Sequence, residues 1–138
     1  MSYKYLEHST DAFIEVKAKN LEEAFSVAGK SVVETIIDLE NIQEIDEKSI
    51  KVRGRNLLNL LYNWLEEIVT ITITDGFAIK KFSVDIKKNT EYEIVSKVFG
   101  EKLDLKKHNF KIEIKSPTFH LMEIKENDEI TMQYLLDL

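Results

Sequence analysis

The decisive stretch of sequence is Glu129-Ile-Thr-Met-Gln-Tyr-Leu-Leu-Asp137-Leu138. Polar and apolar residues alternate along it, and apolar residues continue to its last position. This alternation predicts a β-strand with one buried face. Chain ends usually fray unless a neighbouring element holds them. We therefore expect the strand to pair with the apolar segment Ala12-Phe-Ile-Glu-Val-Lys-Ala18. That pairing would bring Asp11 and Asp137 together.

Two amphipathic helices are expected between these terminal segments. Asn20 is a candidate N-cap for the first helix, whose apolar residues recur at helical spacing to about Asp38. The second helix begins near Asn56 and carries a broad apolar stripe. Its end is ambiguous, because the β-branched residues of Thr70-Ile-Thr-Ile-Thr74 favour a strand, and we expect Asp75-Gly76 to terminate it.

The remaining apolar segments alternate with period two, and polar breaks between them indicate antiparallel hairpins. The fold class is therefore α+β, with two amphipathic helices packed on a mostly antiparallel sheet in a single domain spanning 1–138. After the second helix we expect the strands to form a meander. In addition to the strand that begins at Ala12, we expect strands over 49–53, 77–86, 92–99, 110–124 and 129–138.

Composition restricts the chemistry and the location of the protein. The 138 residues contain no cysteine, which excludes disulfides and thiolate metal sites. Without a leader or a long apolar stretch, the expected location is the cytoplasm, with no membrane partner. The net charge of −6 opposes direct binding to a phosphate backbone. The lysines of the later strands are interpreted as a solvated sheet face.

The expected pair of carboxylates indicates a site for a hard cation. Mg²⁺ and Ca²⁺ prefer oxygen ligands, and Asp11 and Asp137 together with a backbone or terminal carboxylate oxygen of Leu138 would supply them. The alternative is that Asp11 stabilises a turn and that Asp137 is solvated. Spacing alone leaves both interpretations open.

Other motifs point less clearly to chemistry. Gly29-Lys30-Ser31 resembles the end of a phosphate-binding loop, but it lies inside a predicted helix. The histidines lack the spacing of a zinc site, and His108 and His120 are each interpreted as satisfying a backbone group. Pro117 indicates an edge strand, a bulge or a bend. Lys115, just before it, could direct its ammonium toward the two carboxylates or a partner's phosphate, or it is a surface lysine on an edge strand.

Several segments in order resemble the archease family, and the resemblance extends over essentially the whole chain. It rests on His8-Ser-Thr-Asp11, Leu60-Leu-Tyr-Asn-Trp-Leu-Glu-Glu67, Gly100-Glu101, Lys115-Ser-Pro-Thr-Phe-His120 and Leu136-Asp-Leu138.

This resemblance implies an activator of an RtcB-type RNA ligase in tRNA splicing and RNA repair. It implies that the chain promotes guanylylation of the ligase histidine and multiple turnover, as a protein cofactor rather than an enzyme. Asp11, Asp137 and Leu138 would bind a divalent ion, Ca²⁺ or alternatively Mg²⁺ or Mn²⁺. Lys115 would be functional, with His8, Thr118 and His120 as further candidates.

In this interpretation RNA is met only indirectly, through the ligase. Two other classes of function stay open. One is a metal-dependent phosphohydrolase, to which Asp38 could contribute a further ligand. The other is a general RNA-binding or chaperone-like module, whose affinity for RNA should fall steeply with salt.

Overall fold

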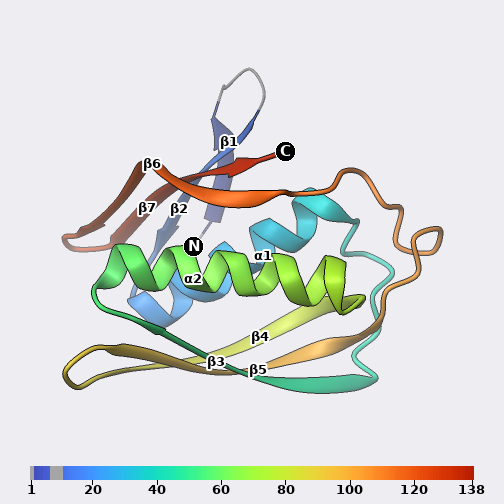
Figure 1. Cartoon of the computed structure of the whole chain (residues 1–138), viewed down its shortest axis with the longest axis horizontal. Coiled ribbons are helices and arrows are strands. Elements are labelled where there is room, and N and C mark those ends of the chain that lie inside the picture. Colours follow the sequence, from blue (N-terminus) through green and yellow to red (C-terminus); the bar gives the residue numbers. More distant parts are fainter. Residues whose placement is uncertain (1, 7–10) are drawn as a thin grey trace.

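The computed structural model describes residues 2–6 and 11–138, and these form three layers. Two helices lie between two antiparallel sheets (Figure 1). Sheet A has the strand order β1-β2-β7-β6, and sheet B has the order β3-β5-β4. The elements are β1 (Ser2–Leu6), β2 (Asp11–Ala18), α1 (Leu21–Ile36), β3 (Asp46–Gly54), α2 (Leu57–Val69), a π-helical turn (Thr70–Thr74), β4 (Phe77–Lys88), β5 (Tyr92–Lys102), β6 (Ser116–Glu126) and β7 (Ile130–Asp137).

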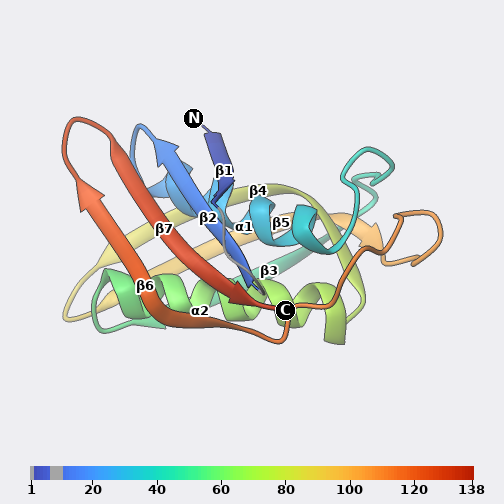
Figure 2. The same ribbon diagram turned by 90° about the horizontal axis from the view of Figure 1, so that it is seen from above.

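The expected pairing of the terminal segments is confirmed. β2 and β7 are antiparallel neighbours in continuous register, from Asp11 opposite Asp137 to Ala18 opposite Ile130. Figure 2 shows the start of β2 beside the end of β7. The faces that carry Ile14 and Tyr134 are fully buried, so the alternation that predicted the strands also fixes which side covers the helices.

Both helices begin where the sequence predicts, and an asparagine caps each one. The Asn20 side chain accepts a hydrogen bond from the backbone N–H of Glu23 at 2.9 Å, and Asn56 accepts one from Asn59, also at 2.9 Å. The ambiguous segment after α2 is helical, and Thr70–Thr74 continues α2 as a π-helical turn. Ile71 within it is buried, so the continued burial of the apolar stripe overrides the strand preference of its β-branched residues.

Trp64 lies at the centre of the core and is fully buried. Its indole N–H donates to the backbone oxygen of Phe25 at 2.8 Å, which joins α2 to α1. The Phe82 ring of sheet B meets the indole edge-on, with ring centroids 6.0 Å apart. Gly29, on α1, faces the same Phe82 ring. The tripeptide that begins at Gly29 therefore belongs to a packed helix, as expected, and forms no phosphate loop.

The α+β class with antiparallel strands is confirmed, but the expected meander after the second helix is wrong. The last four strands form two hairpins, and residues 103–115 cross from sheet B to sheet A. The expected strand over 110–124 therefore begins only at Ser116. Between its two ends, the crossing backbone is hydrogen-bonded to the end of α1 and to Asp38, just after it. Lys111 N–H donates to the Ile36 oxygen at 2.8 Å, and Asp38 N–H donates to the His108 oxygen at 2.9 Å.

No helix in the described residues combines the length and the apolar character needed to span a bilayer.

Candidate metal centre

The register of sheet A brings the two carboxylates of the expected site together. Asp11 is the first residue of β2 and lies directly opposite Asp137, the last residue of β7. Side chains directly opposite in an antiparallel pair share one face, with Cβ atoms about 5 Å apart. By strand alternation, Asp11 and Asp137 lie on the face away from the helices. Asp137 is exposed and Asp11 is half-buried.

The third strand at this corner is β6, which brings Lys115 and Ser116 to Asp137. Ser116 is opposite Asp137 on the side away from Asp11. The Lys115 backbone N–H donates to the Asp137 carbonyl oxygen at 2.8 Å. The Lys115 side chain is exposed, and its ammonium forms no ion pair with any residue that the structure describes. Its main chain is therefore fixed at the carboxylate pair, while its charge is available to a partner.

A depression of about 420 Å³ lies next to Asp11. Leu138 is part of its lining, so the structure brings the last residue to the same corner as Asp11. On the far side, Lys111 Nζ donates to the Glu34 carbonyl oxygen at 2.8 Å. The Tyr5 and Thr35 hydroxyls are hydrogen-bonded at 2.9 Å. The wall of this depression is thus held by α1, β1 and the crossing segment together.

Asp38 has partners of its own. Asn109 Nδ2 donates to one carboxylate oxygen at 2.8 Å, and the Lys111 ammonium lies 3.1 Å from the other. These bonds, from Asn109 first and then Lys111, hold the pKa of Asp38 below its usual value. Asp38, just after α1, therefore anchors the crossing segment to the end of that helix.

The donor set at the corner fits a cation that takes only part of its ligands from this chain. Within 2–6 and 11–138, no three His, Cys, Asp or Glu side chains are grouped as a metal cluster would require. Mg²⁺ is commonly bound through one or two carboxylates, with water and substrate phosphates completing the shell, whereas Ca²⁺ takes six to eight oxygens. Asp11 and Asp137 supply two carboxylates, so either ion would take its remaining oxygen ligands from outside this pair. His8 lies outside the described residues.

Thr118 and His120 lie further along β6, where the strand bends. The register between β6 and β7 shifts between Thr118 and Glu123, and Leu121 has a φ of 61°. Thr118 Oγ1 accepts the His120 N–H at 3.2 Å, and Gln133 Nε2 donates to the Leu121 oxygen at 2.8 Å. The irregular edge strand that the proline indicated is thus confirmed. Thr118 stabilises the bend, and the His120 side chain is exposed beyond it.

A second polar cluster, centred on Glu101 and His108, has a structural role. The His108 ring is fully buried, and its Nδ1 accepts the Asp104 N–H at 3.0 Å. The ring proton is therefore on Nε2, which donates to Glu101 Oε2 at 2.8 Å. Glu101 also accepts from Lys107 Nζ at 2.9 Å and from the Gln43 N–H at 3.0 Å. This cluster joins β5, the loop after α1 and the crossing segment.

The same cluster predicts a pH-dependent contribution to stability. Hydrogen bonds from Lys107 first, then from His108 and Gln43, lower the pKa of Glu101 from 4.5 to about 2. A depressed pKa means that the carboxylate stabilises the fold above pH 4.5 and loses this effect as the pH falls toward 2. We expect Glu101→Gln to be less stable than wild type at neutral pH, with the difference shrinking through this window. Urea denaturation of both proteins across pH measures it, and a pH-independent difference would contradict the role of the charge.

The fold and the corner define a class: a two-sheet α+β domain that joins its terminal strands at a pair of carboxylates. The chain belongs to the archease family, because the model of the Archease protein family (MTH1598/TM1083) matches residues 3–138. The archease of Pyrococcus abyssi is 34% identical over 90% of this chain and 88% of its own length. The archease of Pyrobaculum islandicum is 33% identical over 100% of this chain and 96% of its own.

Solved structures agree with this assignment. Protein 1598 of Methanobacterium thermoautotrophicum superposes with a TM-score of 0.84 and 28% identity, covering 99% of both chains. An archease from Thermotoga maritima, described as a possible chaperone, has a TM-score of 0.63 and 20% identity over 98% of this chain and 96% of its own, and supports the fold alone.

Proposed function

We propose that this chain activates an RtcB-type RNA ligase in tRNA splicing and RNA repair, by promoting guanylylation of the ligase histidine and multiple turnover. The observation that carries the proposal is the register that sets Asp11 opposite Asp137 in an archease fold. The chain carries no complete nucleotide-binding motif, so it serves as a protein cofactor, and RNA is met only through the ligase.

Asp11 and Asp137 would hold the divalent ion, with a backbone or terminal carboxylate oxygen of Leu138 as a further donor. The ion is Ca²⁺ in this proposal, with Mg²⁺ or Mn²⁺ as alternatives. A bound divalent cation neutralises phosphate charge during nucleotide transfer. Because this chain supplies few ligands, the remaining positions fall to water and to phosphate oxygens on the ligase side. Both carboxylates lie on the face of sheet A away from the helices, where a partner can reach them.

Lys115 complements this corner with a cation. Its backbone is anchored to Asp137, and its exposed ammonium extends from the edge strand. We assign it to a phosphate of the ligase-bound nucleotide or to an acidic group on the ligase, because an ammonium beside the metal corner adds positive charge where phosphate charge must be neutralised.

The function is tested by multiple-turnover joining of RNA ends by the purified cognate ligase, with GTP and a divalent ion. Addition of this chain should raise the number of turnovers per ligase. No change with an active cognate ligase would contradict the proposal, and so would phosphoester turnover by this chain alone. The second result would instead favour the phosphohydrolase alternative.

Lys115→Met should weaken stimulation of the ligase by about tenfold or more, because it removes one charge-assisted contact. Its effect on the stability of the free protein should be small, since the side chain is exposed and the backbone hydrogen bond persists. Lys87→Met, at an exposed position of sheet B, is the matched control and should stimulate like wild type. Stimulation is measured as ligase turnover at subsaturating activator. Equal stimulation by the two variants would remove Lys115 from the interface.

A further inference from the structure

β6 presents one free edge at the border of sheet A. Its other edge pairs with β7, and no described strand pairs with the free one. After the bend, regular pairing resumes at Glu123 and continues to Glu126. A free strand edge carries unpaired backbone donors and acceptors and is a template for another strand. This end of β6 is far along the strand from the carboxylate corner at Ser116.

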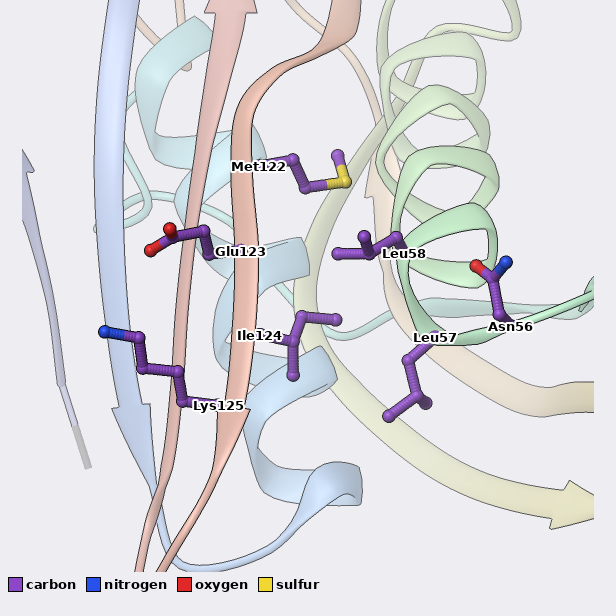
Figure 3. A pocket seen from close by; sticks show the side chains of 7 residues that line it. All are labelled: Asn56, Leu57, Leu58, Met122, Glu123, Ile124 and Lys125. Carbon is purple, nitrogen blue, oxygen red and sulfur yellow. The ribbon is translucent and has the colours of Figure 1, made fainter.

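An apolar groove of about 390 Å³ runs beside this edge. Figure 3 shows Met122 and Ile124 pointing from β6 toward the first turn of α2, where Leu57 and Leu58 face them. Leu58 is 39% exposed, a large value for a leucine facing the interior of a layered fold. A strand added to β6 would cover these side chains.

The opposite face of the same segment carries two unpaired charges of opposite sign. Glu123 and Lys125 point away from α2 (Figure 3) and are exposed. Their neighbours on β7 are the uncharged Gln133 and Thr131. Neither charge has an ion-pair partner among the residues the structure describes.

We propose that β6 pairs with β6 of a second copy of this chain, antiparallel and centred on Ile124. A two-fold axis through Ile124 places Glu123 of each copy opposite Lys125 of the other, so that both charge pairs form at once. On the inner face, Ile124 meets its own counterpart above the leucines of the two α2 helices. The two A sheets become one continuous sheet, and the apolar groove is covered.

The charge pattern selects this register over its neighbours. In an antiparallel pair, facing residues share a side, so a symmetric pairing must be centred on a residue. Centring on Glu123 sets two glutamates opposite each other, and centring on Lys125 sets two lysines opposite each other. Like charges directly opposite destabilise a strand pair. Only centring on Ile124 satisfies both charges, which is why the occupant is a second copy of this chain.

Complementary charge reversals test this pairing. Sedimentation equilibrium over a range of protein concentration should show a monomer–dimer equilibrium for the wild type. Glu123→Lys and Lys125→Glu each turn both cross-strand pairs into like charges, and each should weaken self-association by about tenfold or more. An equimolar mixture of the two single variants restores opposite charges at both positions, and it should form a heterodimer that neither variant forms as a homodimer.

Each result decides the proposal. Recovery in the mixture, together with recovery in the double variant Glu123→Lys/Lys125→Glu, supports it. It is overturned if the wild type stays monomeric at a protein concentration of about 1 mM. It is also overturned if the single variants dimerise like wild type, or if a different protein protects the β6 amides from hydrogen exchange while this chain alone stays monomeric. Circular dichroism confirms that the exposed substitutions leave the fold intact.

Discussion

Asp11→Asn removes the stabilisation that a divalent cation gives to this protein. In the function proposed above, the wild type would hold the cation through Asp11 and Asp137, which lie opposite each other at the joined termini. A ligand that binds only the folded state stabilises it by about 2.7 kcal/mol at a concentration 100 times its Kd. The variant keeps a single carboxylate, so thermal unfolding in Ca²⁺, Mg²⁺ or Mn²⁺ should match unfolding in a chelator.

Glu15→Gln is the matched control for this substitution. Glu15 lies on β2 on the same face as Asp11, four residues further along, and it pairs with Lys4 at 3.4 Å. It changes the net charge by the same amount and leaves the corner intact. Cation-dependent stabilisation should persist in this control. If Asp11→Asn retained it as well, the ion would bind elsewhere and the site assignment would be wrong.

Gly100→Ala should unfold or severely destabilise the protein. A Cβ atom at Gly100 would lie 1.8 Å from the Ala78 backbone oxygen and 2.9 Å from the Ala78 carbonyl carbon. The contact falls beside the register shift between Ile79 and Lys81 of β4, where the two strands approach closely. Because the obstacle is the backbone of the paired strand β4 and not a side chain, it cannot rotate away, and the strands must separate. We expect a loss of about 3 kcal/mol or more, measured by urea denaturation.

Gly29→Ala provides the contrasting control within the same core. A Cβ atom there meets only the end of the Phe82 ring, at 2.7 Å. The ring can shift, and alanine favours a helix over glycine by about 1 kcal/mol. The two effects oppose each other, so the net change should stay within about 1 kcal/mol. If Gly29→Ala and Gly100→Ala cost the same, the backbone contact would not be the cause.

The elements nearest the chain ends were predictable because two local signals agreed there. Period-two alternation marked both terminal strands and their buried faces, and the pairing of Asp11 with Asp137 followed from it. The candidate cap Asn20 located the start of the first helix, because a side-chain acceptor at the N-cap satisfies a free backbone N–H.

The division into two sheets could not be predicted in the same way. Alternation shows which face of a strand is buried, but it does not show which strand is its neighbour. Residues 110–115 carry alternating apolar residues that resemble a strand, yet the Lys111 N–H donates to Ile36 at the end of α1 and not to a strand. The binding of Asp38 to Asn109 and Lys111 follows from the same crossing, and no local pattern marks it.

At the candidate site, the sequence predicted that Asp11 and Asp137 meet, but not which residues surround them. The depression beside Asp11 is walled by Glu34, Thr35 and Lys111, which are distant from Asp11 in sequence. Lys111 reaches the last turn of α1, a helix that has no basic residue of its own there. These contacts exist only because the crossing segment passes the end of α1.

Single-turnover guanylylation of the purified ligase tests the central claim most directly. The reaction contains GTP and a divalent ion, with wild type, Asp11→Asn, Glu15→Gln or no added chain. We predict that wild type and Glu15→Gln accelerate formation of the ligase–guanylate adduct and that Asp11→Asn leaves it at the basal rate. Full acceleration by Asp11→Asn would contradict the assignment of activation to the carboxylate pair.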